Sequence, residues 1–294
     1  MLKNMIIKKA EILGYCMGVR RAVETAELAC RENPDKKIFT LGPLIHNNSA
    51  LEVLAEKGVN VLKEDASDLA ADAENSVVIV RAHGVPPLVM QNLKSRGVTV
   101  IDATCPRVLS SQKRAADYAK RGYTVFLAGD KNHGEVVGIS GYARASGADC
   151  IVIEHKEDAA AVKYVPEKAV LLSQTTISRS EYDAIAAVLK AKNDALVVLN
   201  TICPATDERQ NALIELCKNV DGILVIGGKH SANTKRLLRT AQDLCAHAAL
   251  IETAEEIPQE FFALERIGLT AGASTPDFVI DSVETALLEH PCKI

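Results

Sequence analysis

Residues 98–106 read Val-Thr-Val-Ile-Asp-Ala-Thr-Cys-Pro, and this stretch decides the fold class. Its β-branched beginning is typical of a buried strand, and Pro106 favours the start of a helix. Cys105 therefore stands where a strand ends and a helix begins.

The same pattern occurs at two other places in the chain. Residues 196–204 read Leu-Val-Val-Leu-Asn-Thr-Ile-Cys-Pro around Cys203. Residues 10–15 form a weaker strand pattern before Cys16, and a helical pattern follows each cysteine. A cysteine in the same context three times indicates an internal repeat, which strand–helix alternation alone does not explain.

Each repeat continues with two further apolar strands that end in polar, glycine-containing loops. The loops after the first of these strands are Gly42–Asn48, Gly129–Glu135 and Gly227–Asn233. The loops after the second are Arg81–Gly84, Ser173–Thr176 and Ala271–Ser274. Strands that alternate with helices predict parallel sheets, and ligands of such sheets bind at the carboxyl ends of the strands.

We therefore expect an α/β protein of three pseudo-symmetric α/β lobes. The predicted lobes are residues 12–104, 105–199 and 200–289, with an N-terminal strand in residues 1–11 packing against the third. Approximate threefold symmetry would direct the cysteines and the polar loops toward one axis.

Three thiolates at one point repel each other, so a cation is expected among them. The helix after each cysteine lowers the pKa of the thiol through its N–H groups and dipole. An iron–sulfur cluster with three cysteine ligands, a zinc ion held by three cysteines and a histidine, and three unligated cysteines all remain open. The other cysteines are interpreted as core or surface thiols: Cys30, Cys150, Cys217, Cys245 and Cys292.

The polar loops hold donors that suit phosphate oxygens. They include His46, His83, His133, Ser231, Asn233 and Ser274. Glu135 is the natural proton donor near an anionic substrate, and Thr175 and Gln174 are placed to relay or orient its proton.

Composition excludes several functional classes. The net charge is −4, aromatic residues make up 4% of the 294 residues and Trp is absent, which argues against a nucleic-acid partner. No apolar run approaches the roughly 20 residues that span a bilayer, and the N-terminus has no signal-peptide pattern. We expect a cytoplasmic protein with no membrane partner.

Taken together, the motifs resemble the LytB/IspH family of 4-hydroxy-3-methylbut-2-enyl diphosphate reductases. The matching stretches cover nearly the whole chain in order: Gly14–Val19, Gly42–Asn47, Arg81–Val85, Asp102–Pro106, Asn132–Val136, Ser173–Thr176, Asn200–Cys203 and Thr270–Ser274. The resemblance implies a trefoil of three lobes around a central iron–sulfur cavity. It also implies a 4Fe-4S cluster on Cys16, Cys105 and Cys203, whose unligated iron binds the allylic hydroxyl of the substrate.

The implied reaction removes that hydroxyl with two electrons and two protons and gives isopentenyl diphosphate and dimethylallyl diphosphate, the last step of the non-mevalonate isoprenoid pathway. By motif match, the diphosphate and substrate ligands are His46, His83, His133, Thr175, Ser231, Asn233 and Ser274. His133, Glu135 and Thr175 form the catalytic group, with Glu135 as the donor. The implied partners are the allylic diphosphate and an electron donor such as ferredoxin or flavodoxin.

The chain departs from the family pattern at Ala232, where a serine is common. A hydroxyl contact to the diphosphate is thereby lost, although the Ala232 N–H remains. Two other functions stay open at this point: a zinc hydrolase that uses the same cysteines, and a non-catalytic iron–sulfur sensor with a pocket for a phosphorylated ligand.

Overall fold

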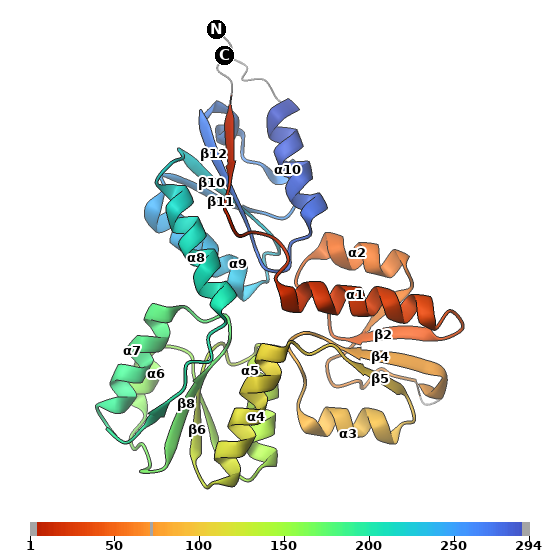
Figure 1. Cartoon of the computed structure of the whole chain (residues 1–294), viewed down its shortest axis with the longest axis vertical. Coiled ribbons are helices and arrows are strands. Elements are labelled where there is room, and N and C mark those ends of the chain that lie inside the picture. Colours follow the sequence, from red (N-terminus) through yellow and green to blue (C-terminus); the bar gives the residue numbers. More distant parts are fainter. Residues whose placement is uncertain (1–4, 71–72, 290–294) are drawn as a thin grey trace. The chain divides into compact units, whose positions relative to one another are not determined.

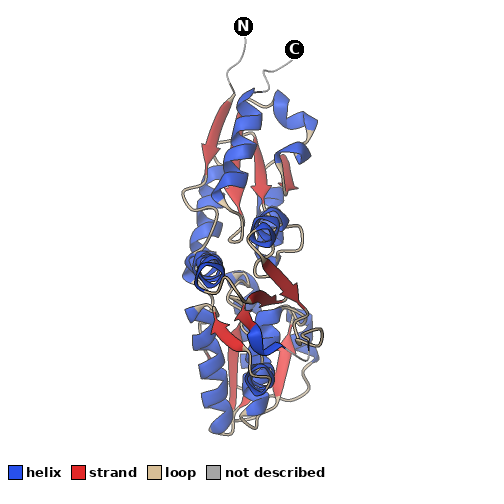
Figure 2. Ribbon diagram, turned by 90° about the vertical axis from the view of Figure 1, so that its right-hand side faces the viewer, coloured by secondary structure: helices blue, strands red, loops and turns tan. Residues whose placement is uncertain are grey.

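The computed structural model describes residues 5–70 and 73–289, and these residues form three sheets of four parallel strands each (Figure 1). Helices alternate with the strands along the chain and flank them (Figure 2). The predicted α/β class is confirmed. Residues 1–4 of the expected N-terminal strand and Cys292 lie outside the described residues.

All three sheets have the same strand order. One is β3-β2-β4-β5, made of β2 (Lys37–Leu41), β3 (Val59–Leu62), β4 (Ser76–Val80) and β5 (Thr99–Asp102). The next is β7-β6-β8-β9, made of β6 (Thr124–Ala128), β7 (Cys150–Ile153), β8 (Ala169–Ser173) and β9 (Val197–Val198). The last is β11-β10-β12-β1, made of β1 (Ile6–Lys9), β10 (Gly222–Ile226), β11 (His247–Ile251) and β12 (Arg266–Ala271).

The helices that follow the cysteines are α1 (Met17–Glu32), α4 (Pro106–Lys120) and α8 (Pro204–Cys217). The other α-helices are α2 (Asn48–Glu56), α3 (Pro87–Ser95), α5 (Gly134–Ala145), α6 (Lys156–Ala161), α7 (Arg179–Lys190), α9 (Ala232–Leu244) and α10 (Asp277–Glu289). Short 3₁₀ helices are η1 (Ala73–Asn75), η2 (Ala254–Glu256) and η3 (Gln259–Ala263). No helix in residues 5–70 and 73–289 combines the length and hydropathy needed to cross a bilayer.

The chain divides into two compact units. The first contains residues 1–20, 45–53 and 204–294, and the second contains residues 21–44 and 54–203. The first unit holds the sheet of β10 and β12, and the second holds the other two sheets. The three-lobe boundaries and the trefoil arrangement stay predictions.

The middle strands β4, β8 and β10 form the centre of each core. Every residue of these strands is buried, because helices cover both faces of a parallel sheet. This burial explains why their sequences are continuous apolar runs rather than alternating ones. The buried strands therefore hold the polar loops at their carboxyl ends in defined positions.

Two of the predicted strands are shorter than the sequence indicated. Residues 10–15 lie in a loop, because β1 ends at Lys9 and Gly14 has a left-handed backbone conformation with φ of +75°. The predicted strand before Cys203 is reduced to β9. There the Ser173 N–H donates to the Thr201 hydroxyl oxygen at 2.7 Å, and the Thr201 hydroxyl donates to the Ser173 carbonyl at 2.9 Å. These two bonds take the place of backbone bonds between the strands.

Each cysteine follows an edge strand of one of the three sheets. Cys105 follows β5 in the sheet of β4, Cys203 follows β9 in the sheet of β8, and Cys16 follows β1 in the sheet of β12. The structural repeat therefore begins after a cysteine and ends with the next one, and β1 completes the last sheet by pairing in parallel with β12.

Candidate active site

The same hydrogen bond holds each of the three repeated cysteines. The Cys105 N–H donates to the Ala82 carbonyl at 2.9 Å, and the Cys16 N–H donates to the Ala273 carbonyl at 3.1 Å. The Cys203 N–H donates to the Thr175 carbonyl at 2.9 Å. Each cysteine is thereby tied to the loop after the neighbouring strand, so the sheet fixes its position.

This bond also corrects the alignment of the repeats. Counted from the cysteine that begins each repeat, at 67, 70 and 71 residues, the sequence predicts His83, Thr175 and Ser274 as equivalent positions. The hydrogen bonds make Ala82, Thr175 and Ala273 equivalent, so His83 and Ser274 correspond to the residue after Thr175.

The three cysteines differ from the other described cysteines in their position. Cys16, Cys105 and Cys203 are half-buried, form no disulfide and directly precede helices, whose first N–H groups have no partner within the helix. Burial raises the pKa of the Cys150 thiol and raises that of Cys217 to about 12. Those thiols stay protonated at neutral pH, which agrees with their interpretation as core residues.

In the second unit, Glu135 is a buried carboxylate held at both oxygens. It lies in the first turn of α5 and is 1% exposed. The Thr175 N–H donates to Oε1 at 2.6 Å, and the Thr175 hydroxyl donates to Oε2 at 2.7 Å. Since the Thr175 carbonyl also accepts the Cys203 N–H, one residue orients the carboxylate and anchors a cysteine.

Gln174 makes a different set of hydrogen bonds. Its Oε1 accepts the Asp130 N–H at 2.8 Å, and its Nε2 donates to the Thr176 hydroxyl at 2.9 Å. Its amide therefore fixes the loop after β6, whereas Thr175 holds Glu135.

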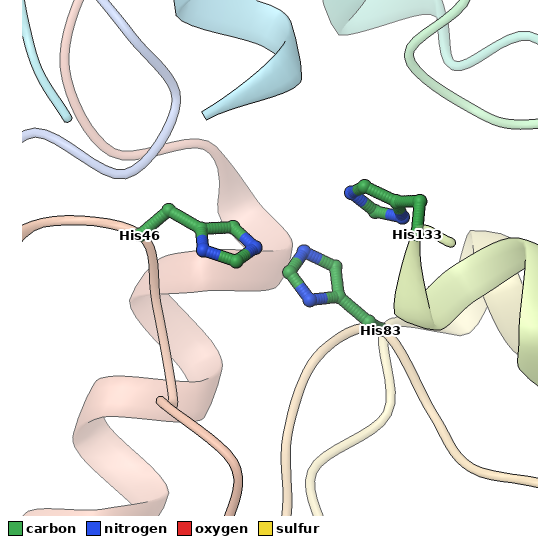
Figure 3. Close-up of side chains that lie close together, drawn as sticks. All are labelled: His46, His83 and His133. Carbon is green, nitrogen blue, oxygen red and sulfur yellow. The ribbon is translucent and has the colours of Figure 1, made fainter. Parts of the chain in front are cut away.

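Two histidines face each other in the same unit. The rings of His83 and His133 meet edge to face, with centroids 4.8 Å apart and planes at 68° (Figure 3). His133 is also the N-cap of α5, where its Nδ1 accepts the Glu135 N–H at 3.2 Å. The unit thus brings together two of the cysteines' loops, two imidazoles and one carboxylate at the carboxyl ends of its strands.

The remaining predicted residues lie in the first unit, also at the carboxyl ends of strands. Ser231 is the N-cap of α9, and its Oγ accepts the Thr234 N–H at 3.3 Å. Asn233 in the first turn is 8% exposed, and its Nδ2 has no hydrogen-bond partner among the described residues. A buried amide without a partner beside a helix N-terminus suits an anionic oxygen.

His46 and Ser274 belong to two loops of this first unit. A side chain at Gly228 would overlap the His46 carbonyl, so only glycine lets the His46 loop lie against the end of β10. Ser274 follows Ala273, whose carbonyl holds Cys16. Ala232, the first residue of α9, brings no hydroxyl to this group.

Two buried arginines were not predicted from the sequence. Arg209 on α8 donates to the Gly14 carbonyl at 3.0 Å and the Ala271 carbonyl at 2.8 Å, which ties the Cys16 loop to β12. Arg81, at the end of β4, is 2% exposed and forms an ion pair with Glu64 at 2.7 Å. An arginine in an expected helix or polar loop is interpreted as a surface residue, so no sequence pattern indicated the burial of either.

The Arg81 guanidinium lies against two of the motif glycines. A Cβ at Gly42 would lie 2.8 Å from Arg81 Nη1, and a Cβ at Gly134 would overlap Nη2. Gly134 stands between His133 and Glu135, so the guanidinium supports the turn that carries both side chains.

We predict that Gly134→Ala destabilises the protein by about 1–3 kcal/mol through overpacking. Alanine otherwise suits the helical position, so the cost arises from Arg81. Chemical denaturation measures it in the wild-type and Arg81→Ala backgrounds. The cost should be smaller when the guanidinium is absent, and equal costs in both backgrounds would contradict the explanation.

Comparisons with known proteins show the family of this chain. The family model described as "LytB protein" matches residues 7–288. A 4-hydroxy-3-methylbut-2-enyl diphosphate reductase of Treponema denticola is 50% identical, over 97% of this chain and all of the relative. One of Thermoanaerobacter pseudethanolicus is 41% identical, over 95% of each chain.

Solved structures are similar as well. A structure described as (E)-4-hydroxy-3-methyl-but-2-enyl diphosphate reductase, the terminal enzyme of the non-mevalonate pathway, is 36% identical with a TM-score of 0.72, covering 97% of this chain and 100% of its own. The E-1-hydroxy-2-methyl-but-2-enyl-4-diphosphate reductase of Plasmodium falciparum is 29% identical with a TM-score of 0.87, covering 96% and 87%. The family expected from the motifs is confirmed.

Proposed function

We propose that this chain reduces 4-hydroxy-3-methylbut-2-enyl diphosphate, because it belongs to the LytB protein family. The reaction breaks the allylic C–O bond, forms a C–H bond and releases water. It consumes two electrons and two protons and gives isopentenyl or dimethylallyl diphosphate. The observation that carries the proposal is the repeated cysteine, held three times by the same backbone bond before a helix.

Cys16, Cys105 and Cys203 would hold a 4Fe-4S cluster. The donor set fits such a group, since the thiols are half-buried, unbridged and placed before helix N-termini that stabilise thiolates. A cluster usually takes four cysteines, so three leave one iron without a protein ligand. When bound, the cluster supplies electrons and a Lewis-acidic iron for the leaving hydroxyl.

The diphosphate is held by neutral donors from the loops. Ser231, Asn233 and Ser274 offer hydroxyl and amide groups, and the α9 N-terminus adds N–H groups and a favourable dipole. His46 and His83 complete this substrate-binding set. The support is the buried Asn233 Nδ2, which has no partner in the described part of the chain.

Glu135 delivers the proton that the leaving hydroxyl needs. Its carboxyl is buried, and Thr175 fixes its orientation through two hydrogen bonds. A positioned acid of this kind contributes to the rate without leaving its place. His133, beside Glu135 and His83, belongs to the same proton-delivery group.

The electrons come from outside the chain, from a carrier such as ferredoxin or flavodoxin. A cytoplasmic location belongs to the same proposal. It is supported by the seven cysteines in the described residues, none of which forms a disulfide, as a reducing compartment requires.

Anaerobic purification followed by iron, sulfide and zinc analysis tests the cofactor. We expect about four iron and four sulfide per chain, and turnover of the allylic diphosphate when reduced methyl viologen supplies electrons. Stoichiometric zinc without iron would point to a zinc hydrolase instead. Iron-loaded protein that gives no product under these conditions would point to a non-catalytic sensor.

A further inference from the structure

The three helices that follow the three cysteines are equivalent in the repeat but differ in their exposed charges. On α8 the exposed charged residues are acidic, Glu208 and Glu215. On α1 they are of both signs: Arg20, Arg21, Glu24, Arg31 and Glu32. On α4 they are basic except for Asp117: Arg107, Lys113, Arg114 and Lys120.

These four side chains of α4, here called the basic stripe, lie on its exposed side, where Asp117 stands between the two arginines and the two lysines. Arg107 and Arg114 are seven residues apart, as are Lys113 and Lys120, so each pair is separated by two helical turns. The opposite face of α4, including Val108, is buried. It packs against β6, β8 and α5, which runs beside it (Figure 1).

The basic stripe has no partner within its own unit. None of its four residues forms an ion pair in residues 5–70 and 73–289, although the same part of the chain contains ion pairs such as Arg81–Glu64. Arg121, the next basic residue, lies over the rings of Tyr118 and Tyr123 instead. The whole chain carries a net charge of −4, so unpaired positive charge on one helix is a local feature.

The basic stripe begins two residues after Cys105, where the proposed reaction has to receive its electrons. The chain has no G-x-G-x-x-G dinucleotide fingerprint, and the substrate brings no electrons, so a separate reduced carrier must approach this region. Opposite charge accelerates such an encounter and selects the partner.

We propose that the basic stripe of α4 is the docking surface for an acidic one-electron carrier protein. The inference rests on the proposed reductase function and names the partner of that site. Two reduced carriers each lose one electron during a turnover. The substrate gains both electrons and two protons, loses its hydroxyl as water and forms one C–H bond.

The test is the variant Lys113→Glu/Arg114→Glu, which reverses charge in the middle of the basic stripe and leaves the residues near Cys105 unchanged. Turnover is measured with two donors, an acidic reduced ferredoxin and reduced methyl viologen. We expect the KM for ferredoxin to rise by about tenfold or more at low salt, and the difference to shrink at high salt. Viologen-driven turnover and the iron content should stay at wild-type values.

The matched control is Lys163→Glu/Lys168→Glu, which makes the same charge change on exposed residues in the segment between α6 and β8, at the amino end of β8. It should leave the ferredoxin KM unchanged. The proposal is overturned if the α4 variant keeps the wild-type ferredoxin KM, if the control raises it equally, or if the α4 variant loses ferredoxin-driven and viologen-driven turnover alike.

Direct binding separates this inference from the proposed reaction. Titration calorimetry with oxidised ferredoxin reports docking without turnover, and we expect the α4 variant to bind at least about tenfold more weakly than the wild type. Equal binding by both overturns the docking surface. Wild-type protein that binds ferredoxin but reduces no substrate with viologen overturns the reductase function alone.

Discussion

Cys105→Ser is expected to lose its iron and to lower turnover by more than about a hundredfold, since even groups that only support metal ligands cost 10–100-fold when removed. Serine is a harder and far less acidic ligand than a thiolate. Anaerobic iron and sulfide analysis, the visible absorption spectrum and viologen-driven turnover measure the effect.

The structure makes this substitution a clean test of ligation. Cys105 is the N-cap of α4, and its side chain makes no capping hydrogen bond. Serine is among the preferred N-cap residues, so the helix is not weakened by the change. The Cys105 N–H bond to the Ala82 carbonyl also survives, because it belongs to the backbone.

Cys30→Ser is the matched control for Cys105→Ser. Cys30 is a half-buried cysteine of α1 whose thiol pKa is raised by burial and by the nearby Glu27. We expect this variant to keep its iron and its turnover. A Cys105→Ser protein with wild-type iron content, or a Cys30→Ser protein without iron, would contradict the assigned ligand set.

The sequence predicted the middle strands and their loops because burial on both faces leaves an unmistakable signature. β4, β8 and β10 are continuous apolar runs, and each ends at a glycine or a polar loop. The edge strands carry less information. β3 and β11 are partly exposed, and neither is a continuous run of β-branched residues.

The sequence predicted those candidate site residues whose chemistry follows from their residue type. Cysteines before helices, and one carboxylate among glycines and histidines, are rare enough to identify from one chain. Arg81 was not predictable, because its role depends on two glycines from different loops that the fold brings against its guanidinium. The exact register of the repeat also required hydrogen bonds, since only these distinguish Ala82 from His83 as the anchor of Cys105.

Glu135→Gln is expected to keep the cluster and substrate binding but to lower kcat by about 10²–10⁴-fold, the usual contribution of a positioned general acid. Glutamine has nearly the same shape and retains one oxygen that accepts a hydrogen bond from Thr175. Its amide group has no acidic proton to give. The measurements are kcat with reduced viologen, the dissociation constant of the substrate and the iron content.

Two further variants separate proton donation from the orientation of the carboxyl. Thr175→Val removes the hydroxyl bond to Oε2 but keeps the N–H bond to Oε1 and the carbonyl that holds Cys203, so kcat should fall less than in Glu135→Gln. Thr175→Ser retains the hydroxyl and should retain most of the activity. A loss in Thr175→Val that equals the loss in Glu135→Gln would mean that orientation, rather than the proton, limits the rate.

The control for Glu135→Gln is Glu154→Gln. The Glu154 carboxylate also accepts a backbone N–H, that of Lys131 at 2.9 Å, in the loop that leads to His133. The change of charge and shape is identical, but this carboxylate is not held by Thr175. If kcat is normal in Glu154→Gln and lost in Glu135→Gln, the effect is assigned to the carboxyl proton of Glu135. Normal kcat in both variants would require another acid, and His133, which caps the helix that carries Glu135, is a group able to replace it.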